Sequence, residues 1–513
     1  MTLKQLFHGI EFLDWKAFED VEVKGVTFDS REVGPGFLFV AVQGLQNDGH
    51  RYVNEAYKKG AIGAVMEKGK GGANPPLAAS PNRNQIVVSS TRKSLALLAS
   101  RFFSEPSKRL RLIGITGTNG KTTTSFLIHS ITEAEGIPTG LIGSIHCRIG
   151  EATLPMSHTT PEPVELHRLL SKMVQKKMKA VVMEVSSHAL ALDRVWGCEF
   201  EVAIFTNFTQ DHLDFHGTLE EYFQSKMRLF KDRLESTGSA QREGRALLNV
   251  DDPCFERIHG ETSRSVLTYA IDLPADIKSD QVQMDWKGVS FTTRTPEGDF
   301  PVTSQLVGRH NIYNILAAVG TGLLMGCSIS SIQKGIEKVT HVPGRFEKVD
   351  EGQGFGVIVD YAHTEDALFR LLSTAATLKK RRLITVFGCG GDRDRSKRPS
   401  MGRVAAEWSD VVFLTSDNPR TEDPLTILSD IEKGLLQVQG KQLRMQAFWT
   451  LPDRREAIER AIAMAGPGDL VVVAGKGHED YQIIGNERRH FDDREVCREM
   501  IRKRLVKTRV AGL

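Results

Sequence analysis

Short apolar runs of strand length recur along the chain, separated by stretches that have a helical pattern. The run LIGIT (112–116), for example, leads into a glycine loop and then into TTTSFLIHSITEA (122–134), which we interpret as a helix. Strands that alternate with helices are typical of a parallel α/β sheet. Comparable runs in the first half of the chain are FLFVAV (37–42), AIGAVM (61–66), QIVVSS (85–90), VVMEV (181–185) and VAIFTN (202–207).

The pattern changes twice in the middle of the chain. Residues 262–307 are alternating and turn-rich, which predicts an antiparallel hairpin pair. The longest apolar stretch, 315–329, is rich in glycine and shorter than the roughly 20 residues that a membrane span needs. We therefore expect a buried helix there and no insertion into a membrane.

Beyond residue 343 the apolar runs end in glycine or polar residues. Open α/β sheets bind ligands at the carboxyl ends of their strands, so functional side chains are expected at these positions. The runs are VIVDYAH (357–363), LITVFGCGG (383–391), VVFLTSDNP (411–419) and LVVVAGKG (470–477).

The 513 residues favour about three domains. The Gly/Pro-rich segment 69–82 could be a linker, but a strand and a helix are expected between it and Pro106, so we place the first boundary at 106. Pro343-Gly344 ends a helical pattern and marks the second boundary. The sequence thus predicts an α/β protein with domains at 1–105, 106–343 and 344–513.

Composition and charge narrow the class of protein. Hydrophobic residues make up 40% of the chain and charged residues 26%, and the net charge is only +3. Such a small charge gives no reason to expect nucleic acid or a membrane surface as the partner. The N-terminal segment carries too many charges for a signal peptide, and the six cysteines form neither a CxxC motif nor a disulfide framework. We expect a cytoplasmic monomer.

The segment GTNGKT (117–122) predicts a phosphate-binding loop, because it follows a strand and opens a helix. Its glycines let backbone N–H groups turn toward a phosphate, and the helix N-terminus adds a favourable dipole. Lys121 offers a point charge to the β- and γ-phosphates, and the Thr122 hydroxyl can bind Mg²⁺. Ile115 departs from the general pattern, which has glycine there. The predicted nucleotide contacts are Gly117, Thr118, Asn119, Gly120, Lys121, Thr122 and Thr123.

GTNGKT is also the form that this loop takes in the Mur ligases, and more motifs of that family follow in order. The chain therefore resembles the Mur ligase family over nearly its whole length. The resemblance implies an N-terminal domain for a UDP-sugar, a central P-loop ATPase with a parallel sheet, and a Rossmann-like C-terminal domain for an amino acid. The motifs are HTTPEP (158–163), MEVSSHAL (183–190), TNFTQDHLDFHGT (206–218), YFQSKMRLF (222–230), GRHNIYN (308–314), PGRFE (343–347) and VDYAHT (359–364).

Three further segments resemble one branch of the family. GCGGDRDRSKRP (388–399), SDNPR (416–420) and AGKGHEDYQ (474–482) are similar to members that act third in stem-peptide assembly. These ligases use ATP, through an acyl phosphate, to join a diamino acid to UDP-N-acetylmuramoyl-L-alanyl-D-glutamate in peptidoglycan precursor synthesis. The tetrapeptide DNPR is typical of members that use meso-diaminopimelate. The resemblance therefore implies that the substrates are ATP, this nucleotide-linked dipeptide and meso-diaminopimelate.

The resemblance also implies how magnesium is held. Thr122 and Glu184 would bind a first Mg²⁺, and His212 a second. Lys226 would carry a carbamate derived from CO₂ and use it to hold the second ion, although a helix lysine on its own is expected to face solvent. An acyl-phosphate path is strongly anionic, so metal ions and cations matter more than a nucleophilic side chain. The implied catalytic residues are Lys121, Glu184, His212 and Lys226.

The remaining implied ligand contacts fall into three groups. Those to ATP, besides the loop, are Asn311, Asn314, Arg345 and Asp360. Those to the UDP-linked precursor are Ser30, Thr159, Thr160, Ser186 and Arg194, with His158 and Leu45 as departures from the residues that many relatives have. Those to diaminopimelate are Arg393, Asp417, Asn418, Pro419, Arg420, Gly475 and Glu479, among which the arginines suit a carboxylate held by two hydrogen bonds.

Three alternatives were weighed. The same reaction with L-lysine is disfavoured by DNPR (417–420). Folylpolyglutamate synthetase shares the ATPase core, but the DSREV and GLQNDG segments of the N-terminal part fit it poorly. A non-catalytic scaffold of a plastid transcription complex should carry a transit peptide and eroded motifs, whereas Lys121, Glu184, His212 and Lys226 are all present.

Overall fold

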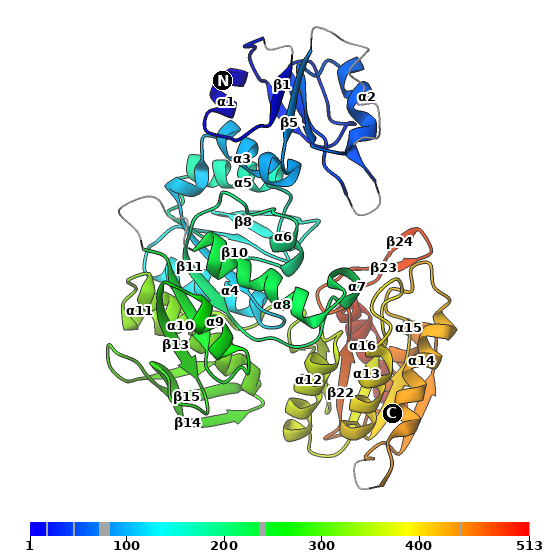
Figure 1. Cartoon of the computed structure of the whole chain (residues 1–513). Coiled ribbons are helices and arrows are strands. Elements are labelled where there is room, and N and C mark those ends of the chain that lie inside the picture. The colour runs from blue at the N-terminus through cyan, green and yellow to red at the C-terminus, as the bar shows by residue number, and fades with distance from the viewer. Residues whose placement is uncertain (17–18, 45–46, 71–82, 235–242, 441–442, 512–513) are drawn as a thin grey trace.

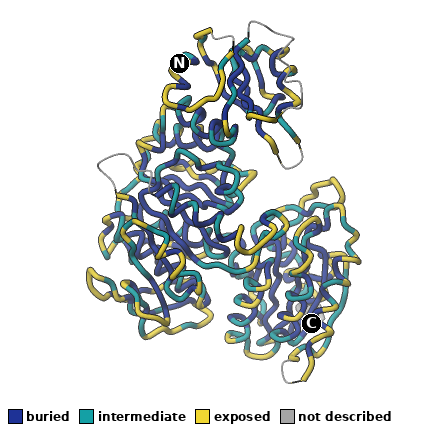
Figure 2. The backbone as a smooth tube through the Cα atoms, in the orientation of Figure 1, coloured by how far each residue is buried: buried dark blue, intermediate teal, exposed yellow. Residues whose placement is uncertain are grey.

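The computed structural model places three large β-sheets in succession along the chain (Figure 1), and the C-terminal part adds a separate two-stranded sheet of β23 (Tyr481–Ile484) and β24 (Glu487–His490). It describes residues 1–16, 19–44, 47–70, 83–234, 243–440 and 443–511. Leu45 and most of the Gly/Pro-rich segment 69–82 lie outside the described residues. In Figure 2 each large sheet lies in a buried centre, with the exposed residues mainly in the connecting loops and outer helix faces.

The N-terminal sheet has the strand order β1-β5-β4-β3-β2, in which β1 pairs antiparallel and the others parallel. Alternate residues of a strand point to opposite faces, so Leu38 joins one apolar cluster and Phe39 another. The elements are β1 (Asp14–Lys16), β2 (Gly25–Thr27), β3 (Phe37–Val40), β4 (Gly63–Glu67), β5 (Asn84–Val88), α1 (Leu3–Phe7), α2 (Val53–Lys58) and α3 (Thr91–Phe102).

The central sheet has the order β16-β15-β14-β13-β12-β11-β6-β10-β7-β8-β9. Helices α4, α10 and α11 contribute to the apolar cluster on one face, and α5 and α8 to that on the other. The elements are β6 (Arg111–Thr116), β7 (Thr139–Ile142), β8 (Cys147–Ile149), β9 (Ala152–Leu154), β10 (Ala180–Glu184), β11 (Phe200–Phe205), β12 (Arg245–Asn249), β13 (Ser265–Ala270), β14 (Ile277–Asp285), β15 (Gly288–Arg294), β16 (Phe300–Ser304), α4 (Lys121–Ala134), α5 (Pro163–Gln175), α6 (Ser187–Ala191), α7 (Leu213–His216), α8 (Leu219–Arg228), α9 (Phe255–Glu261), α10 (Arg309–Leu324) and α11 (Ile329–Lys338).

Two predictions for this region need correction. Within 262–307, β14, β15 and β16 are antiparallel as predicted, but β13 pairs parallel with β12 and β14. Helix α9 lies between β12 and β13 and supplies the crossover that a parallel pair needs. The apolar stretch 315–329 is not one helix, because α10 ends at Leu324 and Gly326, with φ +78°, turns the chain toward α11.

The C-terminal sheet has the order β17-β18-β22-β19-β20-β21, with every pair parallel except β17-β18. Helices α12, α13 and α14 cover one face, and α15 and α16 the other. The predicted strands are confirmed. The elements are β17 (Glu347–Lys348), β18 (Gly356–Asp360), β19 (Leu383–Phe387), β20 (Val411–Leu414), β21 (Ala447–Thr450), β22 (Leu470–Ala474), β23 (Tyr481–Ile484), β24 (Glu487–His490), α12 (Glu365–Leu378), α13 (Lys397–Trp408), α14 (Pro424–Gln437), α15 (Arg454–Met464) and α16 (Asp493–Ala511).

All six cysteines are free thiols, and burial raises the pKa of the Cys389 thiol to about 12, which leaves it protonated. No helix in the described part of the chain combines the length and the apolar character that crossing a membrane requires.

Candidate active site

The phosphate loop joins the end of β6 to the first turn of α4, so its N–H groups lie at a helix N-terminus. Gly117 and Gly120 have φ values of +138° and +88°, a region that favours glycine. A Cβ atom would lie 2.0 Å from Thr206 Oγ1 at position 117 and 2.4 Å from Asn314 Oδ1 at position 120. Both positions therefore require glycine for conformation and for space.

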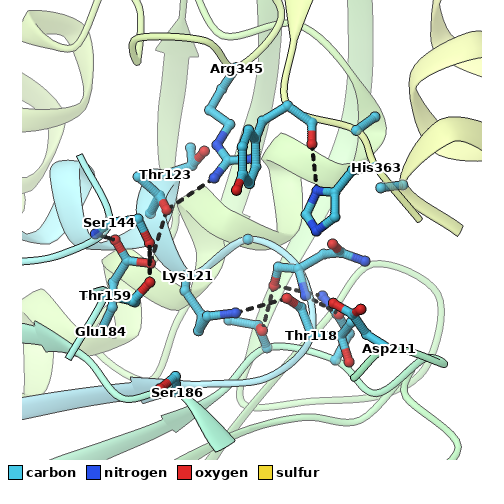
Figure 3. Close-up of a pocket in the computed structure, with 18 of the residues that line it drawn as sticks. Thr118, Lys121, Thr123, Ser144, Thr159, Glu184, Ser186, Asp211, Arg345 and His363 are labelled. Carbon is cyan, nitrogen blue, oxygen red and sulfur yellow. Dashed lines mark hydrogen bonds between the residues drawn. The ribbon is translucent and has the colours of Figure 1, made fainter. Parts of the chain in front are cut away.

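A cavity of about 780 Å³ opens in front of this loop. In Figure 3, Lys121 and Glu184 from the central part face Arg345 and His363 from the C-terminal part across it. Its size lies in the range of pockets that hold nucleotide-sized ligands. The predicted residues that line it are Thr118, Asn119, Gly120, Lys121, Thr122, Thr123, Thr159, Glu184, Ser186, His212, Asn311, Asn314, Arg345, Asp360 and Glu479.

The Glu184 carboxylate is buried at the end of β10 and organises one wall of the cavity. It accepts hydrogen bonds from Thr122 Oγ1 at 2.9 Å, Ser144 N at 2.8 Å and Ser144 Oγ at 3.1 Å. Carboxylate and hydroxyl oxygens suit Mg²⁺, which commonly takes one or two protein carboxylates together with phosphate oxygens and water. No cluster of three or more His, Cys, Asp or Glu side chains arranged for a metal is found among the described residues. Thr122 and Glu184 therefore fit a magnesium ion that a nucleotide helps to hold.

Two lysine side chains meet at one backbone carbonyl below the loop. Lys121 Nζ donates to Gly117 O at 3.0 Å and to Thr118 O at 2.8 Å, and Lys226 Nζ donates to Gly117 O at 2.8 Å. Burial lowers the pKa of Lys121, an effect that the Glu184 and Asp211 carboxylates oppose. Burial and the neighbouring Lys121 charge hold the pKa of Lys226 well below its ordinary value. Both effects disfavour the charged form of the Lys226 amine.

Lys226 is only 2% exposed, which excludes the solvent-facing position that the helix pattern alone would suggest. It lies on α8 one turn after Tyr222, and its Nζ is 4.4 Å from the centre of the Tyr222 ring. The Tyr222 hydroxyl is 3.2 Å from Thr118 Oγ1 in the phosphate loop. Helix α8 therefore packs directly against the underside of the loop.

His212 lies at the start of α7 with φ +55°. Its Nε2 is 3.3 Å from Asp211 Oδ2, and its ring meets that of His188 edge to face with centroids 4.7 Å apart. Burial in this wall lowers the pKa of His212 to about 3, so the imidazole is neutral and keeps a lone pair for a metal. Its ring centre also lies 6.0 Å from that of Tyr222, the ring that Lys226 Nζ contacts.

Arg345 and Asp360 reach the cavity from the C-terminal part. Arg345 Nη2 lies 3.3 Å from Thr122 Oγ1, and its guanidinium packs 4.6 Å from the ring centre of Tyr361. The Asp360 carboxylate accepts from Phe346 N at 2.6 Å and from Ala362 N at 2.7 Å. Burial raises the pKa of Asp360. The phosphate wall is therefore completed by residues on the far side of the Pro343-Gly344 boundary.

Two of the predicted ATP contacts, Asn311 and Asn314, lie on α10 and are buried. Asn314 Nδ2 donates to Asn311 Oδ1 at 2.9 Å, and Asn311 Nδ2 donates to Val307 O at 2.7 Å. Asn314 Oδ1 also accepts from Thr124 Oγ1 at 3.3 Å. These bonds fix both amides behind the phosphate loop.

A contact between the central and C-terminal parts was not anticipated from sequence. Asn119 Nδ2 in the phosphate loop donates to Asp366 Oδ2 at 2.9 Å, and the Asp366 carboxylate also accepts from Arg370 Nε at 2.8 Å. Asp366 follows VDYAHT (359–364) by two residues, so the motif points to it only indirectly. Ser144 was also missed, since it lies in no recognised motif.

The predicted precursor contacts fall into two places. Thr159 and Ser186 lie on the cavity wall, whereas Ser30 lies in the N-terminal part, where its backbone carbonyl accepts from Lys59 Nζ at 2.8 Å. Thr160 Oγ1 donates to Glu184 O at 2.8 Å, and Arg194 Nη1 donates to Thr160 O at 3.0 Å. The last two residues thus support the Glu184 strand end from behind.

The predicted amino-acid contacts follow the carboxyl ends of β19, β20 and β22. Of these residues, Glu479 also lies on the cavity wall, and its Oε2 accepts from Asn418 Nδ2 at 2.9 Å. Arg420 has φ +51°, and its Nη1 donates to Gly391 O at 2.7 Å. A Cβ at Gly390 would lie 3.0 Å from Arg420 Nη1 and 3.7 Å from Arg393 Cγ, so both arginines flank Gly390. Also in the group are Asp417, Pro419 and Gly475.

Comparison with known proteins gives this arrangement its family. Three family models match the chain: "Mur ligase family, catalytic domain" on residues 22–103, "Mur ligase middle domain" on 115–322, and "Mur ligase, glutamate ligase domain" on 344–477. The chain belongs to the Mur ligase family. Its phosphate loop and Glu184 lie in the middle-domain match, and Arg345 and Arg420 in the glutamate-ligase match.

Individual relatives of this Mur ligase resemble it over most of its length. The UDP-N-acetylmuramoyl-L-alanyl-D-glutamate–2,6-diaminopimelate ligase of Geobacillus kaustophilus is 46% identical over 483 residues, 94% of this chain and 96% of the relative. That of Bacillus cereus is 45% identical over 487 residues, 95% and 96% of the two chains. A solved structure of a ligase with the same name matches with a TM-score of 0.67 and 31% identity, covering 98% and 99% of the two chains.

The fold is shared more widely. The MurF ligase of Thermotoga maritima in complex with ADP matches with a TM-score of 0.61 over 96% of this chain and 100% of its own, at 19% identity. A folylpolyglutamate synthase of Mycobacterium tuberculosis with ADP and AMPPCP covers 75% of this chain with a TM-score of 0.59 at 18% identity. At these identities the likeness concerns the fold alone.

Proposed function

We propose that this chain uses ATP to join meso-diaminopimelate to UDP-N-acetylmuramoyl-L-alanyl-D-glutamate, as a step of peptidoglycan precursor synthesis in the cytoplasm. One observation carries the proposal. The phosphate loop, the buried Glu184 and Arg345 face one cavity, and Glu479 links that cavity to the arginine-containing loops of the C-terminal sheet. The names of the relatives with 46% and 45% identity support the choice of substrates.

The chemistry follows from the charges around the cavity. The γ-carboxylate of D-glutamate attacks the γ-phosphorus of ATP, so that ADP leaves and an acyl phosphate forms. The incoming amine then attacks the carbonyl carbon and loses a proton, and phosphate leaves. Lys121, Arg345 and the N–H groups at the α4 N-terminus can offset the negative charge that grows on the transferred phosphoryl group. Thr122 and Glu184 would hold Mg²⁺, which supplies charge neutralisation for the phosphates when bound.

Lys226 would serve as a carbamate. A neutral amine attacks CO₂, a bond forms between Nζ and carbon, and one proton leaves, so that the neutral amine is replaced by an anion. The depressed pKa of Lys226 favours the reactive neutral amine. The new carboxylate would offset the nearby Lys121 charge, and together with the neutral His212 it would supply the donors for a second Mg²⁺.

The remaining assignments follow the same division of the chain. We propose that residues 1–105 bind the UDP-sugar through Ser30, that 106–343 bind ATP, and that 344–513 bind diaminopimelate. Arg345 and Asp366 belong to the C-terminal domain but contact the phosphate loop of the central domain. A change in the relative position of these domains would therefore break or form these contacts. We expect the protein to act as a monomer.

Phosphate release tests the proposed function. The purified protein should release phosphate from ATP only when the UDP-linked dipeptide and the diamino acid are both present. Parallel assays with meso-diaminopimelate and L-lysine identify the amino acid, and mass spectrometry of the product checks that a peptide bond has formed. Preference for lysine would contradict the substrate assignment, and no turnover with either would contradict the ligase assignment.

Lys121→Ala tests the phosphate loop. We expect turnover to fall by on the order of 10²–10³, because one charge contact to the transferred phosphoryl group is lost. The melting temperature should change little, since the side chain contacts only loop carbonyls and the cavity. Near-normal phosphate release by the folded variant would contradict the role of the loop.

A further inference from the structure

A buried lysine that has no role in the proposed mechanism lies at the centre of the amino-acid loops. Lys476 follows β22 and is fully buried. Its Nζ donates to Asn418 Oδ1 at 3.2 Å and to Glu479 Oε2 at 3.2 Å, and lies 3.7 Å from Asp417 Oδ1. The strands that carry these residues are not neighbours, because β19 lies between β20 and β22. Through these hydrogen bonds and ion pairs, Lys476 connects the loop after β22 with the loop after β20.

The cluster around Lys476 has two carboxylates and one ammonium, so one negative charge is in excess. Asp417 is 7% exposed, and its Oδ1 accepts no hydrogen bond from the described residues. A buried carboxylate oxygen without a donor is unfavourable, so the site favours a ligand that brings an N–H group. Gly475 has φ +117°, a backbone conformation that favours glycine, and a Cβ there would be in ordinary contact with Asp417 Oδ2 at 3.4 Å.

A positively charged group lies on the other side of Asn418. Its backbone carbonyl accepts from Gly391 N at 2.9 Å, next to the Gly390 position that Arg420 and Arg393 flank. The Asn418 side chain, in contrast, forms hydrogen bonds with Lys476 and Glu479. The Arg420 guanidinium therefore lies on one side of Asn418, and the two carboxylates around Lys476 lie on the other. This charge pattern matches an α-amino-acid group, in which an ammonium and a carboxylate share one carbon.

We propose that Lys476 is a specificity-determining residue that acts by positioning: it neutralises one of the two carboxylates, Asp417 and Glu479, so that the site accepts a single ammonium group beside a carboxylate. The inference rests on the proposed function, since that ammonium and carboxylate are the distal pair of diaminopimelate. Lys476 does not touch the reacting atoms. Its effect reaches the substrate through Glu479 and Asn418, whose side chains it orients.

The charge balance can be tested by changing it in both directions. Lys476→Met leaves two excess negative charges, so kcat/KM for meso-diaminopimelate should fall about 30-fold or more. The fall should come mainly from the KM of the amino acid, with the KM of ATP little changed. The ratio of kcat/KM for diaminopimelate to that for lysine should decrease. The two uncompensated carboxylates repel the distal carboxylate of diaminopimelate, which lysine lacks. Glu479→Gln removes the excess charge, and should weaken lysine more than diaminopimelate.

The double variant Lys476→Met/Glu479→Gln restores one excess negative charge, and its substrate preference should return toward that of the wild type. Lys476→Arg keeps the charge and should keep the preference. Lys334→Met, at an exposed lysine of α11, serves as the control for loss of a lysine and should behave like the wild type. If Lys476→Met does not fold, the opposite shift in Glu479→Gln and the retained preference in Lys476→Arg still test the balance.

The outcomes separate this inference from the proposed function. A wild-type protein that does not turn over diaminopimelate contradicts both. A second outcome contradicts only the role of Lys476. In it the wild type turns over diaminopimelate, the single variants lose activity toward both amino acids equally, and the double variant recovers no preference. Lys476 would then be a structural ion-pair residue. A narrowed preference that the second substitution reverses supports the charge balance.

Discussion

Lys226→Ala is expected to lose on the order of 10³-fold in turnover, because a metal ion that stabilises transition-state charge is worth several kcal/mol and the carbamate would help to hold it. The variant should fold, because the substitution removes one hydrogen bond to Gly117 O and also removes a polar amine from a buried position. Phosphate release in the presence of both substrates measures the loss. Added formate or acetate should restore part of the activity by supplying a carboxylate to the vacated space.

Two controls distinguish a carbamate from a plain lysine. Exhaustive removal of CO₂, with time for exchange, should lower wild-type activity, and bicarbonate should restore it. Lys172→Ala, at an exposed position on α5, should leave activity and its CO₂ dependence unchanged. An active Lys226→Ala protein without any added acid would exclude an essential modified lysine.

Arg420→Ala should lower kcat/KM for meso-diaminopimelate by roughly 30- to several-thousand-fold, since truncating one partner of a buried charge pair costs about 2–5 kcal/mol. Diaminopimelate differs from lysine by its distal carboxylate, and a guanidinium can hold a carboxylate through two parallel hydrogen bonds. The wild type should reject lysine, which leaves the guanidinium without that partner. The KM of ATP should stay nearly constant.

The backbone of Arg420 is held in place independently of its side chain. Arg420 N donates to Ile483 O at 3.1 Å, and Gly485 N donates to Arg420 O at 2.7 Å, so the loop should persist in the alanine variant. Preference over lysine should narrow without creating a good lysine ligase, because no new favourable contact is added. Arg460→Ala, at an exposed arginine of α15, is the matched control. Unchanged efficiency and preference in Arg420→Ala would show that another group selects the amino acid.

Local features of the chain were predictable because they depend on neighbours in sequence. The strand, loop and helix around GTNGKT (117–122) were predicted, since two glycines with positive φ between an apolar run and a helical pattern specify that geometry locally. The strands of the C-terminal sheet were predicted for the same reason. The hairpin pair within 262–307 was only partly right, because the direction of β13 depends on where its partner β12 lies.

The residues of the site also fall into two groups, those that local sequence predicts and those that packing brings together. The phosphate loop, the polar ends of the strands and, through the motifs, the family can be predicted from the sequence. The burial of Lys226 against Gly117 O, the contact of Asp366 with Asn119, and the position of Lys476 between the amino-acid loops follow from the three-dimensional packing. Each of the last three depends on residues brought together from separate elements. Burial and charge arise from that packing, which spacing along one helix or strand does not specify.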